Sequence, residues 1–549
     1  MKVKVVSWNS NNIPTTEHSD FILEQDSWND HLYFTYYYLH SNLLNEDKSY
    51  SLIGGVRILK KGQKEREKHL INLGQINSLD NFCSLGASLD YYERISQLND
   101  ENKYEVLNFL NDIIQKPSLR EEFKNEEGFN KSVLRDINYE DEIFTLAPTI
   151  ITGKYESLPD KKNLRFTFNS KSLLAEIIFD FSSKEYYNDF IEQKSLPGRI
   201  CVIVGRNGSG KSTLLSKIAR LVFSSTDDRI YIKGLGELKP KGLGFPRIIN
   251  ISYSAFDSFQ VPGITISEKN QILQDMEKNV GRYIYCGVRD IVKEVELELQ
   301  NIKIDKQGKI DIFNILNDKY EYNYLKSIST FKKEFIYALD NIILTEKKCD
   351  LLLEVLNLLS EEPSLYFLKE IEKESITILK EDSFFNNLST GHKFVIHSLF
   401  KLIYHIEKLS LVLFDEPESH LHPPLLAILM KALRFILDSQ SSFMIITTHS
   451  PVVVQETLQK HVIILRREGD LLKTSLPINQ SFGESISSIT SEIFDLTTNY
   501  TDYHIDLDKI VDSYNGDKDN FQKYIMNLFD DKISSQAYAY MMSRYKQSI

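Results

Sequence analysis

The chain has 549 residues, of which 42% are hydrophobic and 26% are charged, and its formal net charge at pH 7 is −12. This length allows two to four domains or one large domain with insertions, and the composition excludes a disordered or collagen-like protein. The acidic balance argues against a protein that coats nucleic acid non-specifically, because such binding depends on lysine and arginine contacts with phosphate.

Nothing in the sequence indicates secretion or a membrane partner. No run approaches the roughly 18 apolar residues of a membrane span, and the start, MKVKVVSWNSNN, lacks the apolar core of a signal peptide. The cysteines lie far apart, without a CxxC pair, at Cys83, Cys201, Cys286 and Cys349. We interpret them as free thiols in a reducing compartment and expect a cytoplasmic protein.

Two segments precede the first motif. Residues 1–68 contain runs of β-forming residues, YFTYYYLH and SLIGGVRILKKG, and predict strands that complete the β-lobe of a larger α/β domain. Residues 69–145 are polar, include FCSLGASLDYYERI and predict a helical insertion. The basic stretch KKGQKEREK (60–68) is more typical of a solvated loop than of a nucleic-acid contact.

Residues 146–263 contain the strongest motif of the chain. Residues 200–204 form a short apolar run typical of a buried parallel strand, and GRNGSGKST follows it, ahead of an amphipathic helix. In this context the pattern GxxxxGK[ST] predicts a loop whose backbone N–H groups converge on phosphates at a helix N-terminus. The predicted nucleotide-binding residues are Gly205, Arg206, Asn207, Gly208, Ser209, Gly210, Lys211, Ser212 and Thr213.

Two side chains of this loop have specific roles. Lys211 would neutralise the β- and γ-phosphate oxygens, and the Ser212 hydroxyl would ligate Mg²⁺. The alternative is a tight glycine turn without a ligand, and the filling of every specified position argues against it.

Residues 264–380 are rich in helical patterns such as YLKSISTFKKEFIYALDNII (324–343). The segment is too short and too often interrupted for a long coiled-coil arm, so it predicts a compact helical lobe. The run IINISY (248–253), just before it, predicts another buried strand.

Residues 381–470 contain LVLFDEPESHLHPP (411–424), which predicts a buried strand ending in two carboxylates. One reading is a metal-bound hydrolase centre that includes His420 and His422. The upstream phosphate loop favours the other reading, half of a nucleotide site. Asp415 would then hold Mg²⁺, and Glu416 would orient or deprotonate the attacking water.

Two further motifs flank this strand. Downstream, FMIITTHSP (443–451) predicts a strand ending in His449, which can contact the γ-phosphate; a buried histidine capped by Ser450 is the alternative. Upstream, NNLSTGHK (386–393) precedes an amphipathic stretch, and alone it would be an ordinary helix N-cap.

Together, GRNGSGKST, LSTG, FDEPESHLHP and TTHS resemble the motif set of ABC-type ATPases, and more narrowly SMC and RecF-like heads and OLD-like ATPases of bacterial defence systems. The resemblance implies an α/β fold: an ABC-type P-loop ATPase head with a mixed β core and helical insertions. It also implies ATP and Mg²⁺ as cofactors, with Lys211, Glu416 and His449 as the catalytic residues.

The same resemblance implies a head-to-tail homodimer with two sandwiched ATP molecules, and leaves higher oligomers open. Ser389, Thr390 and Gly391 would cap the γ-phosphate bound to Lys211 of a second subunit, and ESHLHP would form the D-loop. The family's Q-loop glutamine has no clear counterpart after IINISY, so Asp257 or Gln260 is the alternative.

The phrases IGGVRILKKG, FCSLGASLDYYE, LSTGHK, DEPESHLHPPLL and FGESI are similar to PtuA-type ATPases of Septu and retron anti-phage systems. This similarity implies a regulatory ATPase, with slow ATP hydrolysis in some members of the family, that controls an HNH nuclease partner, PtuB. A retron reverse transcriptase with its RNA–DNA product is a further implied partner.

Two other functions stay open. A RecF/SMC-like DNA repair ATPase would bind DNA across the dimer, and the acidic charge disfavours it. An OLD-like ATPase-nuclease would need a nuclease domain in the helical C-terminal region, residues 471–549, where IDLDK (505–509) is the only acidic pair of interest. Since it lacks an accompanying glycine-framed glutamate, we expect no nuclease activity from this chain.

Overall fold

The computed structural model describes residues 1–7, 19–26, 32–135, 137–183, 185–188, 192–257, 259–301, 316, 323–494, 502–516 and 518–548. The chain divides into two compact units, Met1–Glu484 and Ser485–Ile549. No helix among the described residues is long and apolar enough to cross a bilayer.

A seven-stranded sheet forms the centre of the larger unit, in the order β14-β13-β15-β16-β11-β17-β18. The strands from β14 to β17 are parallel, and β18 pairs antiparallel with β17. This mixed sheet with its helices confirms the α/β class. The bounds are β11 Ile200–Val204, β13 Ile248–Ser252, β14 Tyr283–Gly287, β15 Leu411–Asp415, β16 Phe443–Thr448, β17 Val462–Glu468 and β18 Leu471–Ser475.

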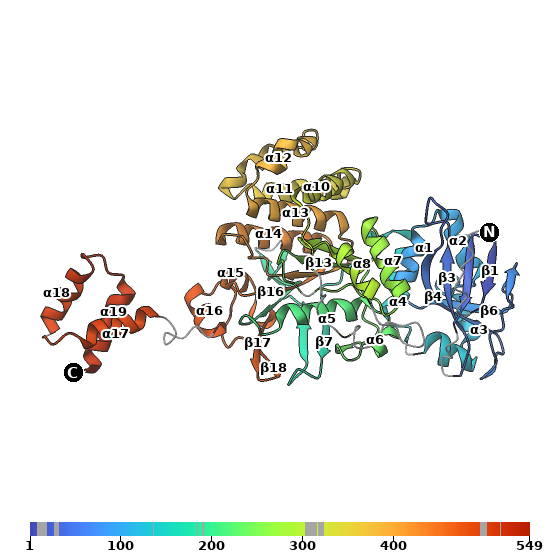
Figure 1. The fold of residues 1–549 in the computed structure, drawn as a ribbon, viewed down its shortest axis with the longest axis horizontal. Coiled ribbons are helices and arrows are strands. Elements are labelled where there is room, and N and C mark those ends of the chain that lie inside the picture. Colours follow the sequence, from blue (N-terminus) through green and yellow to red (C-terminus); the bar gives the residue numbers. More distant parts are fainter. Residues whose placement is uncertain are drawn as a thin grey trace. The chain divides into compact units, whose positions relative to one another are not determined.

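Helices cover both faces of this sheet (Figure 1). Helix α5 (Lys211–Phe223) contacts β13, β15 and β16, while α13 (Thr390–His405) contacts β13 and β14 from the layer that also contains α14 (Pro423–Ser439). All residues of β11, β13, β15 and β16 are buried, as expected for β-branched and aromatic runs covered on both faces.

The N-terminal strands form a separate six-stranded sheet, ordered β5-β1-β2-β3-β4-β6. The expected boundary at residue 68 divides this sheet, because β5 and β6 lie in the segment 69–145 that was expected to be helical. A further three-stranded sheet has the order β12-β7-β8 and contains no strand from residues 1–68. The bounds are β1 Val3–Val6, β2 Phe21–Gln25, β3 Tyr36–Ser41, β4 Ser51–Lys60, β5 Gly74–Ile76, β6 Phe82–Gly86, β7 Arg165–Asn169, β8 Ile177–Asp180, β9 Glu185–Asn188, β10 Glu192–Ser195 and β12 Glu237–Lys239.

The segment 264–380 is mostly helical, but it also supplies β14, the edge strand of the central sheet. The remaining helices of the larger unit are α1 Leu89–Ser96, α2 Asp100–Phe109, α3 Ser118–Phe123, α4 Glu142–Thr152, α6 Asp228–Tyr231, α7 Ile266–Glu277, α8 Ile291–Asn301, α10 Ile328–Ile343, α11 Glu346–Leu359, α12 Asp382–Asn387 and α15 Pro451–Gln455, with short helical turns at Phe129–Leu134, Tyr155–Ser157, Pro363–Glu370, Ile376–Lys380 and Gln459–His461.

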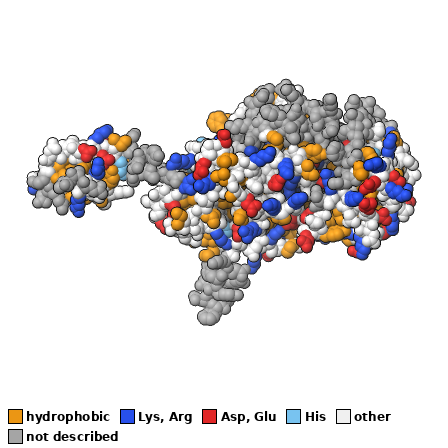
Figure 2. All heavy atoms as spheres, turned by 90° about the horizontal axis from the view of Figure 1, so that it is seen from below, with side chains coloured by type: hydrophobic (Ala, Val, Ile, Leu, Met, Phe, Trp, Pro, Cys, Tyr) orange, Lys and Arg blue, Asp and Glu red, His pale blue; other side chains and the backbone are white. Residues whose placement is uncertain are grey.

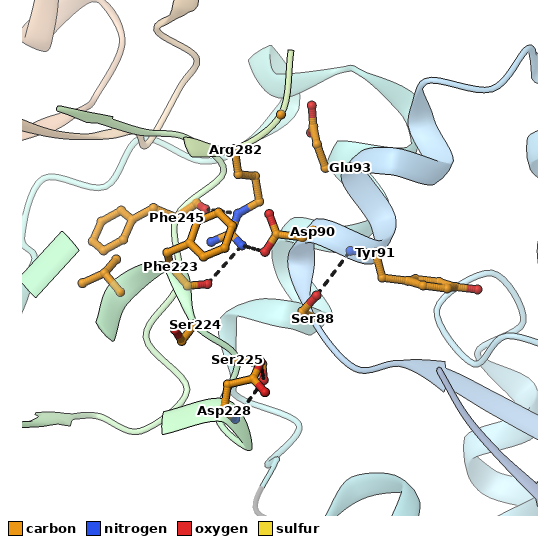
Figure 3. A network of polar contacts seen from close by, with 12 residues as sticks. Ser88, Asp90, Tyr91, Glu93, Phe223, Ser224, Ser225, Asp228, Phe245 and Arg282 are labelled. Carbon is orange, nitrogen blue, oxygen red and sulfur yellow. Dashed lines mark hydrogen bonds and ion pairs between the residues drawn. The ribbon is translucent and has the colours of Figure 1, made fainter. Parts of the chain in front are cut away.

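A buried arginine joins the N-terminal layer to the end of α5 (Figure 3). Arg282 donates to the Asp90 carboxylate of α1 at 2.6 Å and to the carbonyl oxygens of Phe223, at 3.4 Å, and Phe245, at 3.1 Å. Burial raises the pKa of Asp90, and Arg282 opposes that shift. Since buried residues of both layers belong to one hydrophobic cluster, the N-terminal sheet is part of the same folded unit as the central sheet.

The smaller unit is helical, with bounds α16 Ile486–Ile493, α17 Asp502–Asp512, α18 Lys518–Leu528 and α19 Ser535–Ser548. The last three helices enclose a core of their own, formed by Leu507, Val511, Phe521, Ile525, Met541 and Tyr545. The expected C-terminal segment 471–549 therefore begins too early, because β18 belongs to the central sheet and the unit boundary follows Glu484.

Candidate functional site

The glycine-rich loop connects β11 to α5 in a conformation that depends on glycine. Gly208 and Gly210 have φ of 79° and 89°, a region that side chains rarely adopt. A Cβ on Gly205 would overlap the carbonyl oxygen of Leu465 in β17. These positions explain why the loop sequence requires glycine at each of them.

Lys211 and Ser209 lie inside this loop. The Lys211 ammonium is buried and donates to the carbonyl oxygens of Gly205, at 3.0 Å, and Arg206, at 3.4 Å. The Ser209 hydroxyl is buried and has no hydrogen-bond partner among the described residues. Asn207 and Gly208 are exposed, and Thr213, the third residue of α5, is half-buried. The loop thus offers a cation, an unsatisfied hydroxyl and the N-terminus of a 13-residue helix, which fits a polyphosphate.

The two predicted magnesium ligands meet at the ends of α5 and β15. The Ser212 hydroxyl donates to Asp415 at 3.0 Å, although 203 residues separate them in sequence. Thr447 of β16 donates to the same carboxylate oxygen. Burial raises the pKa of Asp415 to about 6, and the two hydroxyl groups oppose that shift. A hydroxyl and a carboxylate are ligands that Mg²⁺ accepts, so this pair fits the ion.

Glu416 and His449 face each other beside this pair. Nδ1 of His449 lies 3.6 Å from Glu416 and 3.2 Å from Glu418. Glu418 also accepts from the His449 backbone N–H at 2.7 Å and from Thr448 at 2.7 Å. These carboxylates, Glu416 first, raise the pKa of His449, and His449 lowers that of Glu416. Glu416 has a φ of 48°, a conformation that non-glycine residues rarely hold.

The signature segment forms the exposed N-terminus of α13. Ser389 is the N-cap of α13, where its hydroxyl accepts from the His392 N–H at 3.2 Å. Ser389 and Thr390 are exposed. A Cβ on Gly391 would lie 3.0 Å from the carbonyl oxygen of His420, so the start of α13 packs closely on the DEPESHLHP turn. The described contacts of Ser389 are local to α13 and do not include the loop of its own chain.

The two histidines of that turn have separate surroundings. His422 is the N-cap of α14 and its Nδ1 accepts from the Leu425 N–H at 3.4 Å. His420 is exposed and has a φ of 69°. In the described part of the chain, no three His, Cys, Asp or Glu side chains are grouped to hold a metal ion.

The segment after β13 contains both candidates for the missing Q-loop residue. Asp257 is buried, pairs with Arg289 and accepts from the Tyr285 hydroxyl at 2.8 Å. Gln260 is 1% exposed, and its side-chain amide has no hydrogen-bond partner among the described residues. Of these two candidates, only Gln260 therefore has a side chain without a described hydrogen-bond partner.

Sequence reasoning missed Thr447, Glu418 and Arg289. Thr447 lies two residues before His449 in TTHS, so the alternation of side chains along a strand could have indicated it. Glu418 lies two residues after Glu416 in DEPES, within a motif that was already recognised. Arg289 had no such signal, because its partner Asp257 is 32 residues away and lies in another loop.

Residues 350–455 match a family model for an AAA domain, whose description names the AbiEii toxin and type IV TA systems. This segment contains the signature, carboxylate and histidine motifs, and its AAA-type match agrees with a P-loop ATPase fold.

Protein ea59 of Escherichia phage lambda is 29% identical over 531 residues, which cover 91% of this chain and 91% of that protein. Similar solved structures include a nucleotide-free ATP-binding cassette from an ABC transporter (16% identity, 59% of this chain, 94% of that chain, TM-score 0.24). An SMC head bound to the C-winged helix domain of ScpA (14%, 58%, 97%, 0.26) and an inward-facing metal-chelate type ABC transporter (15%, 57%, 83%, 0.23) are also similar.

Proposed function

We propose that the protein binds and hydrolyses ATP with Mg²⁺ at the loop between β11 and α5. The observation that carries the proposal is the convergence of Ser212 with Asp415 at 3.0 Å, beside Glu416 and His449. Three separate strand ends supply these groups at the carboxyl edge of one parallel sheet, where ligands of open α/β sheets bind.

In this proposal each residue has a defined task. Backbone N–H groups from Gly205 to Thr213 and the Lys211 ammonium hold the phosphates, and Ser212 and Asp415 hold Mg²⁺, which would neutralise developing charge on the phosphate oxygens. Glu416 orients the attacking water and accepts its proton. His449 lies within reach of Glu416 and donates to the γ-phosphate, so it registers whether that group is present.

A second copy of the chain completes the proposed site. Ser389 and Thr390 are exposed at the N-terminus of α13, a helix of 16 residues whose dipole favours an anion. Since their described contacts are local, they are free to cap the γ-phosphate held by Lys211 of another subunit, together with Gly391. The homodimer is therefore head to tail.

We further propose that this ATPase is a cytoplasmic regulatory subunit of an anti-phage defence complex of the Septu or retron type. The resemblance to PtuA-type ATPases and the match to a model that names the AbiEii toxin support it. Its partners would be the HNH nuclease PtuB and a retron reverse transcriptase with its RNA–DNA product. Co-purification with an HNH protein encoded next to it tests this, and an HNH neighbour that never associates would contradict it.

Two alternatives receive less support. An OLD-like nuclease would use Asp506 and Asp508, yet Asp506 pairs with Lys509 in α17 and Asp508 pairs with Arg544 and accepts from Tyr540 at 3.0 Å. A RecF-like DNA-binding ATPase would need a basic surface. On the face of the larger unit that Figure 2 shows, lysine and arginine side chains are mixed with aspartate and glutamate.

The test of the ATPase proposal is a pair of substitutions. Lys211→Ala is expected to abolish ATP binding, whereas Glu416→Gln is expected to bind ATP, to lose hydrolysis by about 100-fold or more, and to accumulate as a dimer with ATP. Titration calorimetry measures ATP binding, phosphate release measures hydrolysis, and light scattering with and without ATP measures dimer formation. A Glu416→Gln chain that stays monomeric with ATP bound would contradict the shared site.

A further inference from the structure

The hairpin of β17 and β18 runs directly beside the phosphate-binding loop. The carbonyl oxygen of Leu465 in β17 occupies the space that a side chain on Gly205 would need. Two residues further along β17, Arg467 reaches the other end of the loop. A Cβ on Gly210 would lie 3.7 Å from Nη2 of Arg467 and 4.0 Å from Cδ1 of Leu472.

Strand pairing explains why these two side chains arrive together. Arg467 and Leu472 are directly opposite each other in the antiparallel register, so their side chains share one face of the hairpin. The neighbouring residues Arg466 and Lys473 form the next pair and therefore occupy the opposite face. One face of the hairpin is thus directed at Gly210, the residue before Lys211.

The position of this face is fixed by backbone contacts. The Leu472 N–H donates to the carbonyl oxygen of Ser172 at 2.7 Å, and the Leu174 N–H donates to the carbonyl oxygen of Leu472 at 2.9 Å. Leu472 itself is buried. The stem of Arg467 is thereby held against the loop, while its side chain is exposed.

The charge of Arg467 is uncommitted. Within the described part of the chain, its guanidinium has no ion-pair or hydrogen-bond partner. Its neighbours differ, since Lys473 pairs with Glu468 at 3.2 Å and Arg466 donates to Ser475 at 3.4 Å. A guanidinium fits phosphate oxygens with two parallel N–H donors, and it lies here beside the N-terminus of α5, which already favours an anion.

We infer that Arg467 is a further phosphate-contacting residue of the nucleotide site and binds the polyphosphate chain held by the loop. This inference rests on the proposed ATP site. In addition to Lys211 of the loop, the site would contain the guanidinium of Arg467 from a separate element, β17. It explains why an arginine without a described ion-pair partner lies on the hairpin face that is directed at Gly210.

The test measures ATP affinity of the full-length chain by titration calorimetry. Arg467→Ala is expected to weaken ATP binding about tenfold or more, because it removes a charge-assisted contact. Arg466→Ala is the matched control, one residue away on the opposite face, and is expected to stay within about twofold of the wild type. The tenfold difference is expected to shrink when the ionic strength rises from about 0.05 M to about 0.5 M, since salt screens an exposed charge.

Lys211→Ala separates this inference from the proposal beneath it. If Lys211→Ala binds ATP normally, the ATP site itself is wrong, and the inference fails with it. If Lys211→Ala loses ATP while Arg467→Ala stays within about twofold of the wild type, the site stands and the role of Arg467 is overturned. Equal losses of ATP affinity in Arg466→Ala and Arg467→Ala would also overturn it, because they would indicate that the affinity depends only on the net charge of the hairpin.

Discussion

At the scale of single residues, the site is organised around the buried carboxylate of Asp415. Burial favours its protonated form, and the hydroxyl groups of Ser212 and Thr447 favour the charged form that a cation needs. Ser212 would bind the ion together with Asp415, whereas Thr447 only holds the carboxylate in place. The two hydroxyl groups can therefore be distinguished experimentally.

Thr447→Val is expected to raise the Mg²⁺ concentration needed for half-maximal ATP hydrolysis about tenfold, with little change in shape of the side chain. The reason is that groups that hydrogen-bond to a metal ligand typically contribute about 10–100-fold to metal affinity. Thr448→Val is the control, because the Thr448 hydroxyl contacts Glu418 and not Asp415. A magnesium titration of ATPase activity measures both, and equal midpoints for Thr447→Val and the wild type would contradict the assigned role.

At the scale of elements, a chain of hydrogen bonds connects the central sheet to the helical layer. Tyr253, directly after β13, shares a 2.6 Å hydrogen bond with Nδ1 of His397 in α13. Nε2 of His397 lies 3.1 Å from Glu334 in α10. Since β13 leads into the segment of Gln260 and Ser389 is the N-cap of α13, this chain of hydrogen bonds links two segments considered for the proposed site.

Tyr253→Phe is expected to lower the free energy of unfolding of the larger unit by about 1–3 kcal/mol. The phenylalanine fills nearly the same space but leaves buried Nδ1 of His397 without its partner. Tyr366→Phe, at a tyrosine that is 57% exposed in the same unit, is the control. Denaturant unfolding measures the difference, and equal stabilities of Tyr253→Phe and the control would show that the hydrogen bond contributes little.

The same chain predicts a pH dependence. Burial lowers the pKa of His397 below that of a histidine in the unfolded chain, which is about 6.5. Just below this pH, the unfolded chain therefore gains a proton at His397 while the folded protein keeps the ring neutral. The unfolded state therefore binds more protons as pH falls below about 6.5, and stability falls with it, by at most about 1.4 kcal/mol per pH unit from this group. Burial alone would raise the pKa of Glu334, but His397, Lys326 and Lys401 hold that pKa well below its usual range. The folded protein therefore loses further stability as the pH falls below about 4.3, where the glutamate of the unfolded chain takes up a proton.

His397→Gln is expected to make the stability less dependent on pH between about 6.5 and 5.5, because it removes the titrating ring. Denaturant unfolding at both pH values measures this slope for the variant and the wild type. His420→Gln, which changes an exposed histidine, is the control and should keep the wild-type slope. An unchanged slope in His397→Gln would mean that other groups account for the acid sensitivity.

At the scale of the whole molecule, the two compact units have separate cores. All residues proposed for ATP lie in Met1–Glu484, and the helices α17–α19 pack around their own cluster. Cooperative unfolding requires shared packing, so we expect two unfolding transitions.

Phe521→Ala is expected to destabilise the smaller unit by about 3–5 kcal/mol, because Phe521 is fully buried there. ATP affinity should stay within about twofold of the wild type. Leu528→Ala, at a side chain 47% exposed in the same helix, is the control and should cost little. Calorimetric scanning with and without ATP measures both effects, and a loss of ATP binding in Phe521→Ala would show that the units depend on each other.

The sequence by itself determined the elements whose signal is local. The strands β11, β13, β15 and β16 were predicted because each is a short apolar run, and β11, β15 and β16 also end at a recognisable motif. The helices α5 and α13 followed from the spacing of their apolar residues. The loop residues were predictable for the same reason, since the glycine pattern is contiguous in the chain.

Only the tertiary structure decided what depends on residues far apart. The strand β14 lies in a segment read as helical, and the N-terminal strands form their own sheet because β4 pairs with β6 and β1 with β5. Asp257 became unavailable through Arg289, and Arg467 reached Gly210 because β17 pairs with β11, where Val202 lies opposite Val462. Such pairings depend on chain closure over tens to hundreds of residues, and no local pattern encodes which partner is chosen.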